Sequence, residues 1–194
     1  MTERRVTAIV LAGGRSSRFG RNKLAEPIGG QPLLEYAIDA VRPFASEILV
    51  VVAPEASQPV PPNATLVHDP SPFQGPLAGL LAGLDAAREA IVLVAAGDMP
   101  ELFPAVVDAL LASLDDIEID AAVLEHAGRP RPLPMAMRRD PARVTAAALI
   151  DAGERRLRSL PEALATAVIT EATWRAFDPD GRTMRDIDTP ADLR

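Results

Sequence analysis

Short, apolar, β-branched runs alternate along this chain with stretches of helical periodicity, and this alternation restricts the folds open to it. Such an alternation is typical of βα units, whose strands form a mostly parallel sheet. The pattern therefore predicts an α/β fold with a doubly wound, mostly parallel sheet. We expect strands at Val6–Leu11, Glu47–Val52, Ala64–His68, Ile91–Ala95, Asp120–Leu124 and Thr166–Ile169, and helices at Leu33–Val41, Leu77–Ala90, Pro104–Leu114 and Pro141–Ala152.

Two local signals support these boundaries. Prolines stand where the helices should begin, and the first turn of a helix tolerates proline because its N–H groups have no partner inside the helix. They are Pro32, Pro76, Pro104 and Pro141. The run Ile91–Ala95 is apolar at every position, which indicates a strand that helices cover on both faces.

The length of 194 residues predicts one domain, residues 1–194. The chain has no cysteine, which excludes disulfides, thiolate nucleophiles and cysteine-ligated metals. Its two histidines, His68 and His126, are isolated, so neither a multi-histidine metal site nor a Ser-His-Asp triad is expected.

Composition also limits the partners and the location. The net charge of −7, with one tryptophan and one tyrosine, argues against nucleic-acid binding, which needs a basic face and stacking aromatics. No apolar run is long enough to cross a membrane, and residues 1–5 lack the apolar stretch of a signal peptide. We therefore expect a cytoplasmic protein with no membrane partner.

The segment after the first expected strand concentrates positive charge. Residues 12–23 contain two adjacent glycines and four cations, Arg15, Arg18, Arg21 and Lys23, but no acid. Lys23 is the only lysine, whereas the chain has 19 arginines. Cations on a Gly-rich turn favour binding of a small polyanion, and triphosphate is the natural candidate. A surface arginine cluster on an ordinary turn is the alternative.

Unusual residues follow three of the expected strands. The Gly-rich segment follows the first, Asp69 follows the third, and Gly97-Asp98-Met99-Pro100 follows the fourth. In an open α/β sheet, ligands bind at the carboxyl ends of the strands. The three signals together predict a site there.

The Gly-rich segment matches neither common nucleotide motif. Gly14 and Gly20 are separated by five residues, and Arg21 stands where a Walker A motif needs lysine. The segment does not fit G-x-G-x-x-G either, so a dinucleotide cofactor is disfavoured.

The segment resembles instead the signature of nucleotidyltransferases with a doubly wound, Rossmann-like α/β fold. Within that superfamily the whole chain is similar to the molybdenum cofactor guanylyltransferases, the MobA-like family. The matching residues are Leu11-Ala12-Gly13-Gly14, Arg18, Gly20, Lys23, Asp69, Gly75-Pro76-Leu77-Ala78-Gly79, Gly97-Asp98-Met99-Pro100, Arg131-Pro132-Leu133, Ala152-Gly153-Glu154-Arg155-Arg156 and Asp188-Thr189-Pro190-Ala191-Asp192-Leu193. The segments at 75–79 and 152–156 favour the guanylyl branch.

This resemblance implies a reaction and its substrates. GMP would pass from Mg-GTP to the phosphate of molybdopterin or the molybdenum cofactor, with release of pyrophosphate. The N-terminal half would bind the nucleotide and the C-terminal half the acceptor. The resemblance also implies Mg²⁺ as cofactor, and molybdoenzymes or other cofactor-synthesis proteins as partners.

It further implies roles for single residues. Those at the nucleotide are Leu11, Ala12, Gly13, Gly14, Lys23, Asp69, Gly75 and Asp98, and those in catalysis are Lys23, Arg18 and Asp98. Asp98 is expected to bind Mg²⁺, which takes one or two carboxylates together with substrate phosphates. The alternative is a helix cap, although a cap before Pro104 is expected nearer Phe103. Lys23 is expected to act as a point charge on the triphosphate.

Other positions allow two interpretations. Asp69 could bind the nucleotide or serve only the turn that contains Pro70 and Pro72. Gly75, Gly79 and Gly83 recur every four residues, which predicts close packing of a helix on the sheet. Six later arginines could meet the acceptor phosphate but are more often surface cations: Arg129, Arg131, Arg138, Arg139, Arg155 and Arg156.

The chain departs from the family pattern in four places. Asn22 stands where aspartate is usual, and Ala53 where asparagine is common. Asp186 and Asp188, near the expected acceptor site, stand where asparagine is frequent. Two alternatives stay open: a cytidylyltransferase acting on the molybdenum cofactor or a related small acceptor, and a non-catalytic subunit that binds the nucleotide and delivers the cofactor. A sugar-phosphate nucleotidyltransferase is disfavoured, because such enzymes usually carry a longer acceptor region.

Overall fold

The computed structural model describes residues 4–13, 23–25, 27–28, 30–54, 56, 60–69 and 75–187, and of residues 23, 27 and 28 it describes only the backbone. Within these ranges no helix is both long enough and apolar enough to span a bilayer. The expected positions Gly14, Arg18 and Asp188 lie outside the described residues.

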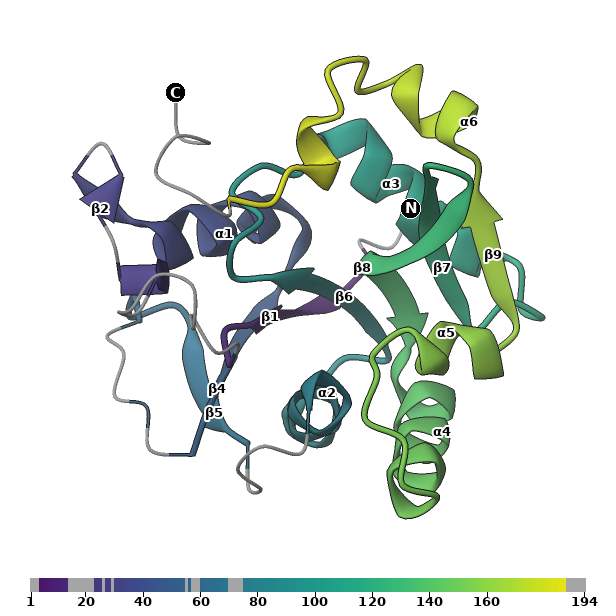
Figure 1. Ribbon diagram of the computed structural model, residues 1–194, viewed down its shortest axis with the longest axis horizontal. Coiled ribbons are helices and arrows are strands. Elements are labelled where there is room, and N and C mark those ends of the chain that lie inside the picture. The colour runs from purple at the N-terminus through teal and green to yellow at the C-terminus, as the bar shows by residue number, and fades with distance from the viewer. Residues whose placement is uncertain are drawn as a thin grey trace.

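A seven-stranded mixed sheet forms the centre of the molecule (Figure 1). Its strand order is β5-β4-β1-β6-β8-β7-β9. The first four strands in this order run parallel, β8 is antiparallel to both of its neighbours, and β9 is parallel to β7. The strands are β1 (Val6–Leu11), β4 (Glu47–Val52), β5 (Thr65–His68), β6 (Ile91–Ala96), β7 (Ala121–His126), β8 (Arg129–Arg138) and β9 (Thr166–Ile169), and a separate antiparallel pair is formed by β2 (Pro27–Ile28) and β3 (Gln31–Pro32).

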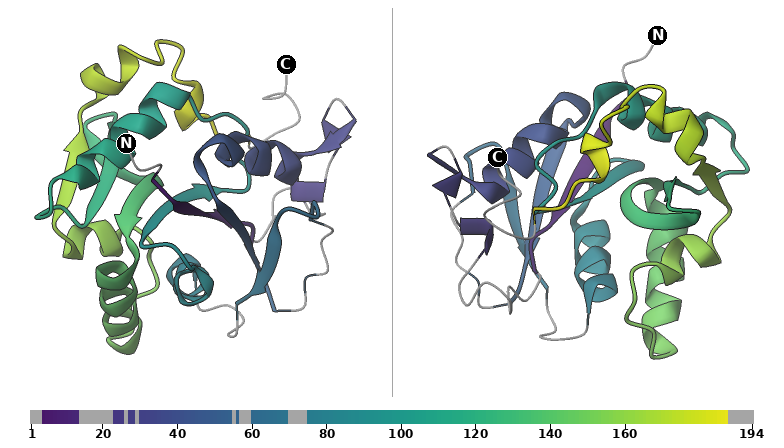
Figure 2. Two further views of the ribbon diagram at one scale, coloured as in Figure 1. Left: turned by 180° about the vertical axis from the view of Figure 1, so that it is seen from behind. Right: turned by 45° about the horizontal axis from the view of Figure 1, so that its top comes forward.

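Helices cover both faces of this sheet, as the two further views also show (Figure 2). The helices α1 and α3 lie on one face, and α2, α4 and α5 lie on the other. They are α1 (Leu33–Val41), α2 (Pro76–Ala86), α3 (Pro104–Ala112), α4 (Arg139–Asp151), α5 (Ser159–Ala163) and α6 (Glu171–Arg175), with 3-10 turns η1 (Lys23–Ala25), η2 (Arg42–Phe44), η3 (Ser113–Asp115) and η4 (Arg182–Met184).

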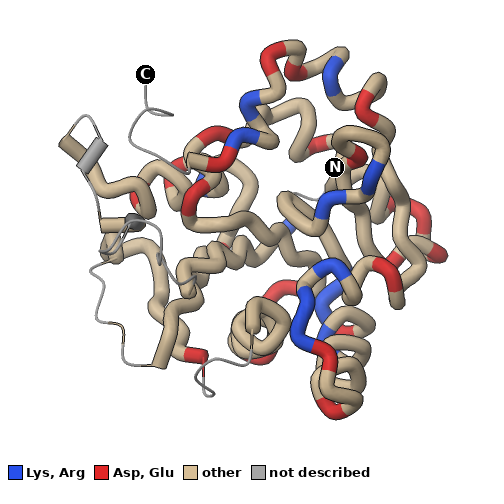
Figure 3. Tube along the Cα trace, viewed as in Figure 1, with Lys and Arg blue, Asp and Glu red and all other residues tan. Residues whose placement is uncertain are grey.

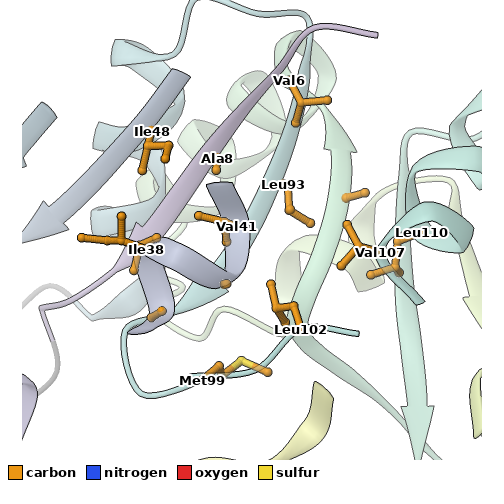
Figure 4. Packing of buried hydrophobic residues seen from close by; sticks show 14 of the residues in the cluster. Val6, Ala8, Ile38, Val41, Ile48, Leu93, Met99, Leu102, Val107 and Leu110 are labelled. Carbon is orange, nitrogen blue, oxygen red and sulfur yellow. The ribbon is translucent and has the colours of Figure 1, made fainter. Parts of the chain in front are cut away.

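The core has one hydrophobic cluster on each face of the sheet. Figure 4 shows the first, in which Ile38 and Val41 of α1 and Val107 and Leu110 of α3 face the sheet residue Leu93. In the second cluster, α2, α4 and α5 bury the opposite face. Four consecutive residues of β6, at 92–95, are therefore fully buried, as expected for a strand between two helical layers. The α/β sheet predicted from the sequence is confirmed.

The sequence prediction did not include β8, although this strand lies inside the sheet. Its first six residues contain Pro130, Pro132 and Pro134, and proline cannot donate a hydrogen bond to a neighbouring strand. The structure accommodates them because residues 129–131 pair with β7 alone, whereas the pairing with β6 is confined to residues 135–138. The prolines precede that segment, where the register with β7 shifts between Val123 and Leu124.

The predicted helix boundaries need a correction at α2. This helix ends at Ala86 rather than at Ala90, because the backbone becomes extended at Ala87 and the two N–H groups after it bind side chains instead of helical carbonyls. The N–H of Arg88 donates to Glu47 at 2.9 Å, and that of Glu89 to the hydroxyl of Thr7 at 3.2 Å. The prolines at 76 and 104 stand at the first helical position, as predicted.

Candidate nucleotide site

Three chain segments meet where the parallel strands end. The N–H of Ala12 donates to the carbonyl of Val51 at 2.7 Å, and that of Asp69 to Val52 at 2.9 Å. The N–H of Gly97 donates to the carbonyl of Leu11 at 2.9 Å. The residues after β1, β5 and β6 thus lie at one edge of the sheet, here called the carboxyl edge, as the sequence predicted.

The first of these segments begins with Leu11, Ala12 and Gly13. Leu11 is half-buried, Ala12 is buried and Gly13 is exposed. A β-carbon on Gly13 would lie 3.6 Å from the backbone nitrogen of Ala53, an ordinary van der Waals contact. Ala53, where the family often has asparagine, therefore lies beside the start of the Gly-rich segment.

The chain returns to the carboxyl edge at η1, next to the segment that contains Asp98. Leu24 is buried, and a β-carbon on Gly97 would lie 3.2 Å from Cδ1 of Leu24 and 3.3 Å from the carbonyl oxygen of Leu11. The backbone of Lys23, which precedes Leu24, is thereby held near the residues that follow β6.

Asp98 lies in the turn after β6 and is half-buried. Its carbonyl oxygen accepts a hydrogen bond from the N–H of Ile187 at 3.0 Å, and Ile187 is buried in the cluster that also contains Met99. This contact brings the backbone at Asp186, an exposed residue, against the Asp98 turn. The structure thus joins the expected metal position to one of the two expected acceptor positions.

A second contact fixes the chain before Ile187. The carboxylate of Asp178 accepts hydrogen bonds from the N–H groups of Arg182 at 3.0 Å and Thr183 at 2.7 Å. The hydroxyl oxygen of Thr183 accepts from the N–H of Phe103 at 3.0 Å. Burial raises the pKa of Asp178, but these donors outweigh burial and hold the pKa below its ordinary value. The sequence analysis did not predict these hydrogen bonds of Asp178 and Thr183, although Asp178-Pro179-Asp180-Gly181 has the composition of a turn.

On the other side of the site, Asp69 lies next to α2. It is half-buried, and a β-carbon on Gly79 would lie 3.8 Å from its Oδ2 atom. Gly79 belongs to the first turns of α2, which start at the carboxyl edge. Asp69 and the N-terminal part of α2 therefore border the same region.

The N-terminus of α2 contacts a segment that is distant in sequence. The carbonyl oxygen of Arg155 accepts from the N–H of Leu77 at 3.4 Å. Gly75 has φ +87°, and a β-carbon there would lie 2.8 Å from the same oxygen. The two segments that favour the guanylyl branch, at 75–79 and 152–156, therefore lie against each other.

Glu154 organises the second of these segments. Its carboxylate accepts from the N–H groups of Arg155 at 2.8 Å and Arg156 at 3.0 Å, from the Arg156 guanidinium at 2.6 Å and from the Ser159 hydroxyl at 2.8 Å. The Arg156 side chain is the main reason that the pKa of Glu154 lies far below its ordinary value.

The later arginines fall into two groups. Arg138 donates to the carbonyls of Ile119 and Leu114, and Arg139 to that of Ala87, at the opposite edge of the sheet. These two arginines therefore bind backbone carbonyls away from the carboxyl edge. Exposed arginines nearer the carboxyl edge are Arg129 and Arg131 at the start of β8, and Arg155 and Arg156 beside α2. Figure 3 shows basic residues (blue) and acidic residues (red) in the segment that joins α4 to α5, which passes beside α2.

Both histidines have ordinary contacts. Nε2 of His68 lies 3.2 Å from the carbonyl oxygen of Ala56, and Nδ1 of His126 lies 3.2 Å from the carboxylate of Glu171. In the described part of the chain, no three acidic or histidine side chains gather closely enough to bind a metal ion. A metal at this edge would therefore need oxygen ligands from a substrate as well.

Comparisons with known proteins agree with this architecture. The family model of the MobA-like NTP transferase domain matches residues 8–167. A "Probable molybdenum cofactor guanylyltransferase" of Chloroflexus aggregans is 36% identical over 194 residues, which cover 97% of this chain and 92% of that protein.

Two solved structures share the fold. The molybdopterin-guanine dinucleotide biosynthesis protein A of Archaeoglobus fulgidus superposes with a TM-score of 0.79 and 26% identity, covering 96% of this chain and 94% of that one. The 2-C-methyl-D-erythritol 4-phosphate cytidylyltransferase of Thermus thermophilus superposes with a TM-score of 0.72 and 23% identity, covering 97% and 95%. The second likeness concerns the fold alone.

Proposed function

This chain belongs to the MobA-like NTP transferase family, and from that premise we propose that it transfers GMP from Mg-GTP to the phosphate of molybdopterin or the molybdenum cofactor, releasing pyrophosphate. The family membership makes it a nucleotidyltransferase. The guanylyl specificity is supported by relatives named as guanylyltransferases, of which one is 36% identical over nearly the whole chain.

The observation that carries this proposal is the contact between Ile187 and Asp98. The N–H of Ile187 donates to the carbonyl of Asp98, so the expected acceptor region and the expected nucleotide region share one edge. A group transfer needs its two substrates in contact, and holding them in line supplies much of the rate. We propose that the N-terminal half supplies most of the contacts to the nucleotide and the C-terminal half most of those to the acceptor.

The proposed reaction requires little chemistry from the side chains. A phosphate oxygen of the acceptor attacks the α-phosphorus of GTP, the bond to the β-phosphate breaks, and the electron pair leaves with pyrophosphate. The acceptor phosphate is already anionic near neutral pH, so no general base is needed. The protein must hold two anions together and neutralise their charge.

Asp98 is the proposed ligand of Mg²⁺, and the site fits such an ion. A carboxylate at the carboxyl edge, with another at Asp186 nearby in the fold, offers the oxygen donors that a hard cation prefers. Bound Mg²⁺ would neutralise charge on the triphosphate. Lys23, with Arg18, is proposed to add positive charge at the phosphates. Leu11, Ala12, Gly13 and Gly14 are proposed to border the nucleotide, with the two glycines presenting backbone N–H groups, because the N–H of Ala12 already binds the carbonyl of Val51.

The base of the nucleotide is proposed to lie beside Asp69 and the start of α2. Both border the carboxyl edge, and Gly75, at the N-terminus of α2, lies against the carbonyl oxygen of Arg155. Asp186 and Asp188 are proposed to lie near the acceptor. Molybdoenzymes or other cofactor-synthesis proteins are proposed as partners of the whole protein.

Pyrophosphate release tests this proposal. The protein is incubated with Mg-GTP or Mg-CTP, each with and without molybdenum-loaded molybdopterin. We expect release with GTP only, and only when the acceptor is present. Release with CTP alone would assign the chain to cytidylyl transfer. No release with either nucleotide, from folded protein and verified acceptor, would contradict the proposed reaction and favour a binding subunit.

A further inference from the structure

The side chain of Glu154 fixes the shape of the turn between α4 and α5. Its Oε1 atom accepts from two consecutive backbone N–H groups, those of Arg155 and Arg156. Its Oε2 atom accepts from the Arg156 guanidinium and from the hydroxyl of Ser159, a buried residue at the start of α5. One carboxylate thus fixes the backbone and two side chains of the turn.

The same turn is attached to the end of α4. The N–H of Glu154 donates to the carbonyl of Leu149 at 2.9 Å, and that of Gly153 donates to the carbonyl of Ile150 at 2.9 Å. The guanidinium of Arg155 also donates to the carbonyl of Ile150, at 3.1 Å. The turn is therefore held from both sides, by the C-terminus of α4 and by the Glu154 carboxylate.

This fixed turn contacts the nucleotide region through one atom. The carbonyl oxygen of Arg155 accepts from the N–H of Leu77, in the first turn of α2, and closely approaches Gly75. The first helical residue, Pro76, has no N–H. The Arg155 oxygen thus occupies one of the few donors that this helix end offers to a ligand.

We propose that Glu154 is a positioning residue for nucleotide recognition, which holds the Arg155 carbonyl against the N-terminus of α2 and thereby fixes one wall of the base pocket. This inference rests on the proposed function, because that function places the base beside Gly75 and Asp69. Among the residues that the structure describes, the hydrogen bonds of the Glu154 carboxylate come from its own turn and from α5, so Glu154 acts on the nucleotide region through Arg155.

The test compares Glu154→Gln with Glu47→Gln. Glu47 is a matched control because its carboxylate also accepts from a backbone N–H and a hydroxyl and is similarly shielded, with 13% of the side chain exposed against 20% for Glu154. Glu47 begins β4, at the edge of the sheet opposite to the proposed site. Binding of Mg-GTP and Mg-ATP to the full chain is measured by calorimetric titration, and KM and kcat by pyrophosphate release.

We expect Glu154→Gln to weaken Mg-GTP binding about tenfold and to reduce the preference for GTP over ATP by a similar factor, since small displacements of a binding wall have effects of this order or larger. KM should rise while kcat changes by less than about twofold, as expected for lost ground-state binding. Glu47→Gln should change thermal stability without changing the preference between nucleotides.

Two outcomes would overturn the inference. One is a Glu154→Gln protein that keeps the native KM and nucleotide preference. The other is an equal change in Glu47→Gln. If Glu154→Gln does not fold, Ser159→Ala serves instead, because it removes one hydrogen-bond donor to Glu154. Ser159→Ala should reduce the preference for GTP over ATP by a smaller factor. An unchanged preference in Ser159→Ala would also contradict the inference. Failure of the proposed function would look different, because the native protein would then show no preference for Mg-GTP.

Discussion

Asp98 is the residue at which a single substitution best separates chemistry from stability. Asp98→Asn keeps the shape of the side chain and the backbone carbonyl that binds Ile187, but removes the negative charge. We expect turnover to fall by about 10²-fold or more, the scale of losing one preorganised electrostatic contact. The melting temperature should change little. Steady-state pyrophosphate release and thermal denaturation measure the two effects.

Asp108→Asn is the control, because Asp108 is an exposed residue on α3 and has no role in the proposed site. It should retain full activity. Asp98→Asn with more than a tenth of native turnover, at saturating Mg²⁺, would remove Asp98 from the proposed mechanism.

At this scale the sequence predicted residues whose positions follow from strand ends. Asp69 and Asp98 were placed at one edge because parallel strands end on the same side, a rule that needs only local patterns. The contact of Arg155 with Gly75 could not be predicted, because it joins segments that are far apart in sequence and depends on how α4 packs beside α2. The buried carboxylate of Asp178 was missed for the same reason: its turn was visible, but its link through Thr183 to Phe103 was not.

Among the elements, α2 packs closely against the sheet at Gly83. A β-carbon on Gly83 would lie 2.9 Å from Cγ2 of Ile9 and 3.1 Å from Cγ2 of Val51, both in buried residues. Gly83→Ala should therefore lower the free energy of unfolding by about 1–2 kcal/mol, since overpacking outweighs the gain in helix propensity. Chemical denaturation measures this change.

Gly79, one turn earlier, provides the comparison. A β-carbon there would have only ordinary contacts, at 3.6 Å from Val51 and 3.8 Å from Asp69. Gly79→Ala should be neutral or stabilise the protein by up to about 1 kcal/mol through helix propensity. If both variants lost the same stability, local packing would not explain the glycine spacing.

The elements also show where prediction from the sequence ends. Continuous apolar runs such as Ile91–Ala95 identified buried strands, because few other elements combine that length and composition. The strand β8 was missed because three prolines among its first six residues are typical of a loop. Its place between β6 and β7 depends on a register shift that no local pattern reveals.

For the molecule as a whole, the depressed pKa of Asp178 links stability to pH. The folded pKa lies below the unfolded value of about 4, so the contribution of this carboxylate is complete above that value and is lost as the pH falls toward the folded pKa. Asp178→Asn should cost about 2–3 kcal/mol at neutral pH, because buried N–H donors lose a charged acceptor. Denaturation at a series of pH values should show the difference from the native protein shrinking below about pH 4.

Asp180→Asn is the matched control for this measurement, since Asp180 lies in the same turn but is exposed. Its pH profile should follow that of the native protein. A difference between native protein and Asp178→Asn that stayed constant down to pH values well below about 3 would show that the ionised carboxylate is not what stabilises the turn.

The hydrogen bond between Ile187 and Asp98 also sets an order of events during synthesis. The strands β1, β4, β5 and β6 all leave the ribosome before the segment that ends at Ile187, and early parts of a chain can begin to fold while later parts are still being made. A nascent chain could thus possess the parallel strands, with Asp69 and Asp98 at their ends, while the backbone that approaches Asp98 is still missing. The hydrogen bond to the carbonyl of Asp98 can consequently form only after residue 187 has been synthesised.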